Sequence, residues 1–248
     1  MQVLFGILFY AAFALLVFGL FVKIKQYAQT PAPLIIPTTP APVTKIGVIW
    51  RMFTEVVFFN SLWKANKWIW LFGWIFHLAL LLAFFRHLRY VVPDDWFIYP
   101  LINNWLILTA GKYGGWAMLF GLTGLFVRRL VVDRVRYISN PSDFAMLLLI
   151  IGIAVTGVLT SFIFKDAYAI VELKAFVIGL LTLNWQPVPD NGLIIAHLSL
   201  VLILMVIFPI SKLLHAPGVF FSPTRNQVDN PREQRHVSPW ARKLESGK

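Results

Sequence analysis

Four of the five histidines in this chain lie within, or at the ends of, long apolar stretches of sequence. His77 and His87 stand ten residues apart in one stretch, and His197 and His215 stand eighteen apart in another. Neutral imidazole is a good iron ligand, and two histidines fill both axial positions of a haem iron. Such a site favours electron transfer because no open position remains for oxygen. The two pairs therefore predict two b-type haems with bis-histidine ligation.

Two other roles for these histidines remain open. One is a hydrogen bond between helices, which would make the chain a non-redox membrane anchor. The other is a proton relay in a channel or transporter, although such relays usually mix carboxylates with histidine. The stretches expected to span the membrane contain no Asp or Glu. Both alternatives predict a colourless protein.

The order of the apolar stretches predicts which histidines face each other. The two stretches are three spans apart and therefore antiparallel, so His77 should face His215 near the inner side, while His87 faces His197 near the outer side. An ideal helix rises about 15 Å between the first two histidines and about 27 Å between the other two. A bend at Pro209, different helix tilts or a frayed end near His215 would absorb this difference.

The composition predicts that these stretches cross a membrane. The chain is 58% hydrophobic and 13% charged, whereas a soluble domain is about half apolar and about a quarter charged. We expect an all-α integral membrane protein, a bundle of about five helices with the haem sites between the second and the fifth. The expected spans are residues 3–22, 68–85, 106–127, 144–164 and 192–215. The absence of cysteine excludes disulfides, Cys-ligated iron–sulfur clusters and covalently attached haem.

Two further apolar segments carry charges and are expected to be interfacial. Ile46–Trp63 holds Arg51 and Glu55 on one helical face. Ala167–Leu183 holds Glu172 and Lys174, which are costly near a bilayer centre, so we expect an interfacial or re-entrant segment. Residues 1–218 would form the transmembrane domain, and residues 219–248 a polar tail that docks on a cytoplasmic partner.

The basic residues predict the orientation. Most of the 22 Lys and Arg lie in residues 23–67, 128–136 and 212–248. The positive-inside rule then places the N-terminus outside and the C-terminus in the cytoplasm of a bacterial cytoplasmic membrane. The net charge of +11 is explained by this orientation and by anionic lipid, so no nucleic-acid partner is expected.

The histidine spacings resemble those of the gamma (cytochrome b) subunit of respiratory nitrate reductase. Two motifs resemble more narrowly the DsrM branch, the cytochrome b subunit of the sulfite-reduction-associated DsrMKJOP complex. The first is Arg136-Tyr-Ile-Ser-Asn-Pro-Ser-Asp143 before a helix with Thr156-Gly157. The second is Phe208-Pro-Ile-Ser-Lys-Leu-Leu-His-Ala-Pro-Gly218, followed by Phe221-Ser-Pro-Thr-Arg-Asn226. The resemblance covers nearly the whole chain.

The resemblance implies a role in a larger oxidoreductase complex. The four histidines would be the axial haem ligands, and quinone would exchange electrons near the outer haem. On the inner side, electrons would pass to or from a cytoplasmic iron–sulfur subunit related to heterodisulfide reductase (DsrK-like), with other membrane and periplasmic subunits nearby. The wider family includes the membrane cytochromes of heterodisulfide reductase and of a cytochrome c complex in sulfate reducers. The chain alone would not be a complete enzyme.

Other residues are candidates for contacts with these groups. Arg86 and Arg89 flank His87 and are candidates for binding the propionates of the outer haem, and Lys212 for those of the inner one. For each residue taken alone, interfacial anchoring is the simpler explanation. Lys112 is a candidate hydrogen-bond donor to quinone by family analogy. His236 in the polar tail is expected to be solvated or to contact a partner.

Overall fold

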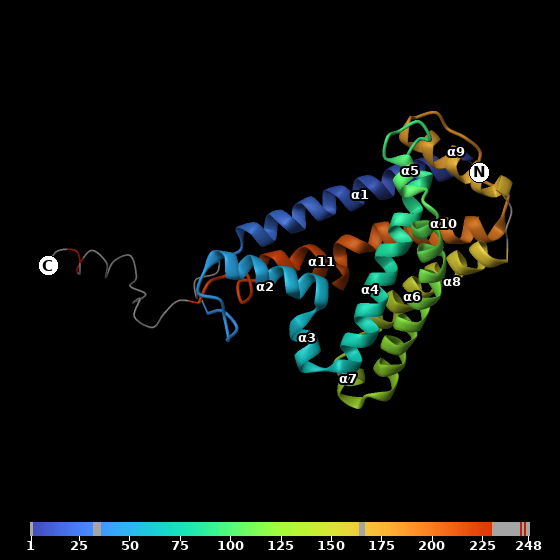
Figure 1. Cartoon of the computed structure of the whole chain (residues 1–248). Coiled ribbons are helices and arrows are strands. Elements are labelled where there is room, and N and C mark those ends of the chain that lie inside the picture. Colours follow the sequence, from blue (N-terminus) through green and yellow to red (C-terminus); the bar gives the residue numbers. More distant parts are fainter. Residues whose placement is uncertain (1, 32–35, 164–166, 230–243, 245, 247–248) are drawn as a thin grey trace. The chain divides into compact units, whose positions relative to one another are not determined.

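The computed structural model describes residues 2–31, 36–163, 167–229, 244 and 246, and these contain helices and no strand (Figure 1). Most of the predicted tail, including His236, lies outside the described residues. The chain divides into two units. The first comprises Met1–Lys23 and Phe59–His215, and the second Ile24–Phe58 and Ala216–Lys248.

Four helices are long and apolar enough to cross a membrane, over Val3–Gln29, Lys67–Tyr90, Pro141–Phe162 and Gly192–Ile210. They contain helices α1 (Gln2–Gln29), α4 (Lys67–His87), α8 (Pro141–Phe162) and α10 (Gly192–Ile207). Helix α6 (Trp105–Val131) is also long, about 40 Å at about 1.5 Å per residue. It is less apolar because it carries Lys112 and several glycines. The predicted all-α membrane fold is confirmed, and the count of five spans stays a prediction.

Asparagine side chains fix where three of these helices begin. Asn66 Oδ1 accepts a hydrogen bond from Ile69 N at 3.0 Å before α4, and Asn104 Oδ1 accepts one from Leu106 N at 2.8 Å before α6. Asn191 does the same for the first turn of α10. Each cap satisfies backbone N–H groups that have no partner within the helix.

Helices α4 and α6 lie side by side because α6 presents glycines to α4 (Figure 1). A Cβ on Gly121 would lie 2.7 Å from Phe72 O and 2.9 Å from Phe76 N. Such small residues let two backbones approach closely within a membrane. A core shared with α8 then forms from Phe76, Ala79, Met118, Leu122, Ile150 and Ala154. This core fixes α4, which carries two of the four histidines.

The apolar segment expected to be interfacial or re-entrant forms helix α9 (Ala167–Leu181), and its lysine is paired. Lys174 Nζ binds the Asp94 carboxylate and lies 4.3 Å from the centre of the Tyr99 ring, at the start of α5 (Tyr99–Ile102). The lysine holds the pKa of Asp94 below its usual value. On its apolar side, α9 buries Phe176 in a core with α1 and α10.

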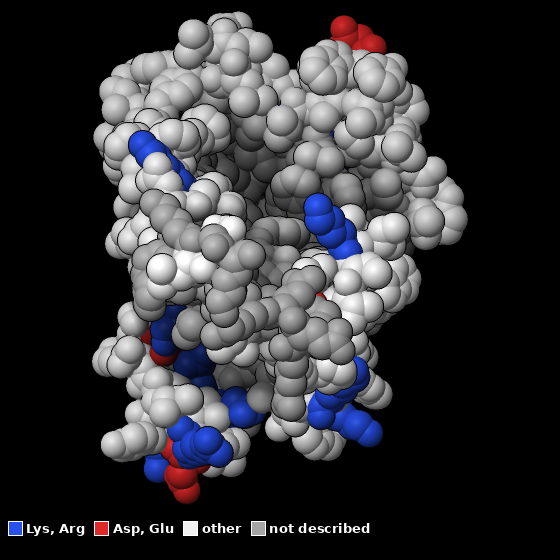
Figure 2. All heavy atoms as spheres, turned by 90° about the vertical axis from the view of Figure 1, so that its left-hand side faces the viewer, with Lys and Arg blue, Asp and Glu red and all other residues white. Residues whose placement is uncertain are grey.

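Lys and Arg gather toward the lower end of the face drawn in Figure 2. Figure 1 places α7 (Asp133–Tyr137) and the turn from α3 (Asn60–Ala65) to α4 at that end. These segments and the end of α6 carry the basic residues Lys64, Lys67, Arg128, Arg129, Arg134 and Arg136. The distribution suits the expected charge asymmetry, and the orientation itself stays a prediction.

The second unit joins helix α2 (Lys45–Phe58) to the residues that follow α11 (His215–Gly218). Glu55 is buried, and Arg225 Nη1 lies 3.4 Å from Glu55 Oε2. Asp229 N donates to Pro42 O at 2.7 Å. The first residues of the predicted tail therefore pack against the chain's own α2 segment.

Candidate functional site

The pair predicted to lie nearer the outer side of the membrane, called the outer pair, joins the end of α4 to α10. The ring centres of His87 and His197 lie 6.3 Å apart, and the two ring planes differ by 14°. The pair predicted to lie nearer the inner side, called the inner pair, joins α4 to the segment after α10. The ring centres of His77 and His215 lie 5.9 Å apart, and their planes differ by 81°. These are the pairs that the antiparallel order of the helices predicted.

Both separations fit two axial ligands on one haem iron. An imidazole nitrogen binds a transition metal at about 2.0 Å, and the ring centre lies about 1.1 Å behind that nitrogen, so two axial rings have centres about 6.2 Å apart. The observed separations are 6.3 and 5.9 Å. A direct hydrogen bond between two rings would bring their nitrogens to about 2.9 Å and their centres closer than this. Both observed separations are therefore longer than a direct hydrogen bond between the rings would give.

Each of the four rings also has its Nδ1 engaged by a neighbouring oxygen. Three of these oxygens are backbone carbonyls, which can only accept. The Nδ1 atoms of His77, His87 and His215 lie 2.7 Å from Gly73 O, 2.6 Å from Ala83 O and 2.9 Å from Lys212 O, respectively. In their neutral form these three rings therefore carry the proton on Nδ1, and Nε2 is the nitrogen left to bind a metal.

His197 reaches the same state through a side chain. Its Nδ1 lies 2.9 Å from Thr156 Oγ1 on α8. The hydroxyl proton of Thr156 is directed to the carbonyl of Gly152 at 2.8 Å, so its oxygen accepts from the histidine. Such a partner fixes the orientation of a metal-binding imidazole and raises its basicity. In the sequence Thr156 stood out only as part of a motif. Its hydroxyl, one residue before Gly157, was the one signal that it could be a hydrogen-bond partner of a histidine.

A cavity of about 400 Å³ opens beside the outer pair. It lies between α4, α6, α8 and α10, and its walls are mainly apolar except for a few polar groups, which include His87 and His197. Gly157 makes room for the imidazole, since a Cβ there would lie 3.3 Å from His197 Cε1. A largely apolar cavity with a few convergent polar groups is typical of a cofactor site.

The three basic residues predicted for this site are placed differently. Arg86 and Lys112 line the cavity, and Arg89 is not among its lining residues. Arg86 Nη1 donates to Ser161 Oγ at 2.9 Å, and Arg89 Nη2 donates to Tyr90 OH at 2.8 Å. The Nε atoms of both arginines are buried and have no hydrogen-bond partner in the described part of the chain. These donors suit carboxylates such as haem propionates.

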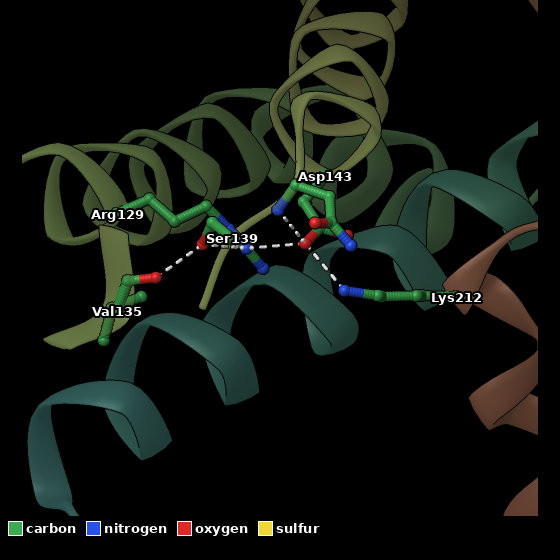
Figure 3. Close-up of polar contacts among 6 residues, drawn as sticks. Arg129, Val135, Ser139, Asp143 and Lys212 are labelled. Atoms are coloured by element: carbon green, nitrogen blue, oxygen red, sulfur yellow. Dashed lines mark hydrogen bonds and ion pairs between the residues drawn. The ribbon is translucent and has the colours of Figure 1, made fainter. Parts of the chain in front are cut away.

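The end of the first unit where α8 begins holds a buried carboxylate, which the sequence analysis included only as the last residue of a motif. Asp143 Oδ2 accepts from Asn140 N at 3.1 Å at the start of α8. It also lies 2.6 Å from Lys212 Nζ and 3.4 Å from Arg129 Nη1 (Figure 3). Lys212, a candidate for binding a propionate, is therefore paired with Asp143.

Helix α10 is shorter than the span predicted to reach His215. It ends at Ile207 and continues as the 3₁₀ turn η2 (Phe208–Ile210), followed by Ser211 in an extended conformation with φ −108° and ψ 171°. Pro209 has no N–H to continue the helical hydrogen bonds. The rise of one straight helix therefore does not apply between His197 and His215, which explains how both pairs form.

Fold and site together define a helical membrane protein with two histidine pairs between α4 and its neighbours. The chain belongs to the nitrate reductase gamma subunit family, whose model matches residues 35–243. It is 33% identical to the Hdr-like menaquinol oxidoreductase cytochrome b-like subunit of Archaeoglobus fulgidus, over 96% of this chain and 83% of the relative. The subunit of the same name from Archaeoglobus profundus is 31% identical, over 93% of this chain and 80% of the relative. The predicted family resemblance is confirmed.

Proposed function

We propose that this chain is the di-haem b subunit of a membrane oxidoreductase complex. It passes electrons between the membrane quinone pool and a cytoplasmic iron–sulfur subunit of the heterodisulfide reductase-like type. The observation that carries the proposal is the geometry of the two histidine pairs. Their ring centres lie 5.9 and 6.3 Å apart, and each Nδ1 is engaged by a neighbouring oxygen. A single histidine between helices would be explained by packing, whereas two couples with this shared geometry favour iron ligation.

The haems supply one-electron redox chemistry, and the protein supplies their ligands and surroundings. His87 and His197 would hold the outer haem, and His77 and His215 the inner one. Phe59 and Phe76 form T-shaped contacts with His77, with ring centres 5.0 and 4.8 Å away. These two aromatic side chains would line the His77 side of the inner haem site.

The cationic groups at the outer end bind the polar parts of the ligands. Arg86 and Arg89, each with a buried Nε that has no partner among the described residues, would hold the propionates of the outer haem. Lys112 lines the same cavity, and its Nζ lies 4.6 Å from the centre of the Phe162 ring. Its ammonium would donate a hydrogen bond to a quinone oxygen. The relatives' names include menaquinol, which supports a quinol as the reaction partner.

The basic inner end, with α7 and the turn from α3 to α4, suits the cytoplasmic side of the membrane. The iron–sulfur subunit would bind on that side, where the inner haem is closer. The N-terminus would then lie outside, and residues 219–248 would remain on the cytoplasmic side.

Haem content and quinol-driven reduction test this function directly. The purified protein should contain about two b-type haems per chain by pyridine haemochrome, and a reduced menaquinone analogue should produce the absorbance of reduced haem b. A protein that contains no haem after purification from a haem-sufficient host would contradict electron transfer. The histidines would then serve in a proton relay or in helix packing. Two haems that no quinol reduces, although dithionite reduces both, would contradict the quinone link alone.

A further inference from the structure

His215 differs from the other three paired histidines in what holds its backbone. His77 and His87 belong to α4, and His197 belongs to α10. The hydrogen-bonded backbone of a long helix fixes the height and direction of a side chain. His215 follows the end of α10, the proline turn and the extended Ser211, so the helix cannot set its position.

Three local contacts and one long-range ion pair replace the helix. Ser211 Oγ accepts from Leu213 N at 3.2 Å and starts the short turn η3 (Lys212–Leu214). Leu214 is buried with 9% exposure. Lys212 makes the other two contacts. Its carbonyl accepts from His215 Nδ1 at 2.9 Å, and its Nζ lies 2.6 Å from Asp143 Oδ2.

Asp143, the partner of Lys212 in this ion pair, is held rigidly. The Asp143 side chain is only 4% exposed and sits in the first turn of α8. Asn140 N and Arg129 Nη1 also approach its Oδ2, at 3.1 and 3.4 Å. Arg129 Nη1 in turn donates to Ser139 Oγ at 2.8 Å, and that hydroxyl donates to Val135 O at 2.7 Å (Figure 3). The carboxylate is thus fixed to the turn between α6 and α8.

We propose that Asp143 is a positioning residue for the inner haem. Through Lys212 it holds the η3 turn against α8 and so aims the His215 imidazole at His77. This inference rests on the proposed di-haem function. The Lys212 side chain is 69% exposed, whereas Asp143 is buried. Loss of the lysine therefore leaves a buried carboxylate short of one partner, and loss of the carboxylate frees the turn that carries the ligand.

Two variants with opposite changes of charge separate positioning from simple electrostatics. Asp143→Asn removes a negative charge and Lys212→Met removes a positive one. If these charges acted only by their field, the midpoint potential of the inner haem would rise in the first variant and fall in the second. If they position His215, both variants change the inner haem in the same way. Its low-spin electron paramagnetic resonance signal broadens and its occupancy falls, while the outer haem keeps its signal.

Lys212→Arg keeps the charge and should restore the wild-type signal. Asp133→Asn is the matched control, because Asp133 forms an exposed pair with Arg136 near the same end, at 2.9 Å. Opposite shifts of potential in Asp143→Asn and Lys212→Met, with both haems retained, would overturn the inference and leave the function standing.

Amide hydrogen exchange gives a readout that does not require haem. In both variants, residues 211–215 should exchange severalfold faster than in the wild type, while the exchange of α4 is unchanged. Exchange at wild-type rates in both variants would overturn the inference that the Asp143–Lys212 pair holds this turn. A wild-type protein without haem would contradict the proposed function, and exchange would still decide whether Asp143 holds the turn.

Discussion

Replacing Thr156 with valine should weaken the outer haem site selectively. The substitution preserves the shape of the side chain and removes the oxygen that accepts from His197 Nδ1 at 2.9 Å. The histidine lies in a membrane-spanning helix, so no bulk water replaces that acceptor. The ring then loses the contact that fixes its orientation and keeps Nε2 directed to the iron.

The size of the effect follows from the lost hydrogen bond. Leaving a buried donor unsatisfied costs about 1–3 kcal/mol, and each 1.4 kcal/mol is about a tenfold change in affinity. Haem at the outer site should therefore bind about 5- to 150-fold more weakly. Loss of a hydrogen-bond partner behind a metal-binding histidine typically costs about 10- to 100-fold in affinity, so we expect a loss of about tenfold.

The measurement is transfer of haem from the purified protein to excess apomyoglobin. Thr156→Val should release one haem faster than the wild type and keep the other. Thr156→Ser restores the hydroxyl and should behave as wild type. Thr160→Val is the matched control, because Thr160 also lines the cavity but its hydroxyl donates only within α8, to Thr156 O at 2.7 Å. Release of both haems from Thr156→Val at wild-type rates would refute the role of Thr156.

Two further predictions concern the scaffold. Gly121→Ala should destabilise the protein by about 1–3 kcal/mol, because its Cβ would lie 2.7 Å from Phe72 O. Thermal unfolding in detergent tests this. Gly192→Ala is the control, because in the described part of the chain no atom beyond its own helix backbone and chain neighbours would lie within 4 Å of the added Cβ. Equal stability of the two variants would refute the close packing. The Lys174 hydrogen bond lowers the pKa of Asp94, so the stabilisation is complete above about pH 3.8 and is lost as the pH falls through the lowered value. Asp94→Asn should remove this acid-dependent loss from an unfolding titration, and an unchanged profile would contradict it.

The histidine pairing could be predicted from the sequence because it depends only on the order of the helices and on the level of each histidine along its helix. The apolar stretches define the order of the helices, and neighbouring spans must alternate in direction. His77 and His87 then fall at opposite levels of one helix, and their partners follow from the antiparallel arrangement. The asparagine caps and the glycines of α6 are equally local signals, readable without long-range contacts.

The parts that the sequence did not predict depend on contacts between distant residues. Asp143 has the sequence signature of a helix cap, and its pairing with Lys212 joins residues 69 positions apart. Lys174 looked too costly for an apolar segment because its partner Asp94 lies 80 positions away. Thr156 and His197 likewise meet only when α8 packs on α10. Periodicity along one helix carries no information about such partners.

The haem content of single histidine variants tests the central claim most directly. Each of His77→Ala, His87→Ala, His197→Ala and His215→Ala should reduce about two b-type haems per chain to about one. Variants of His87 and His197 should retain the same haem, with one residual spectrum and midpoint potential, and variants of His77 and His215 should retain the other. A colourless wild type, or residual haems that group the histidines in any other way, would contradict two bis-histidine haems held by these pairs.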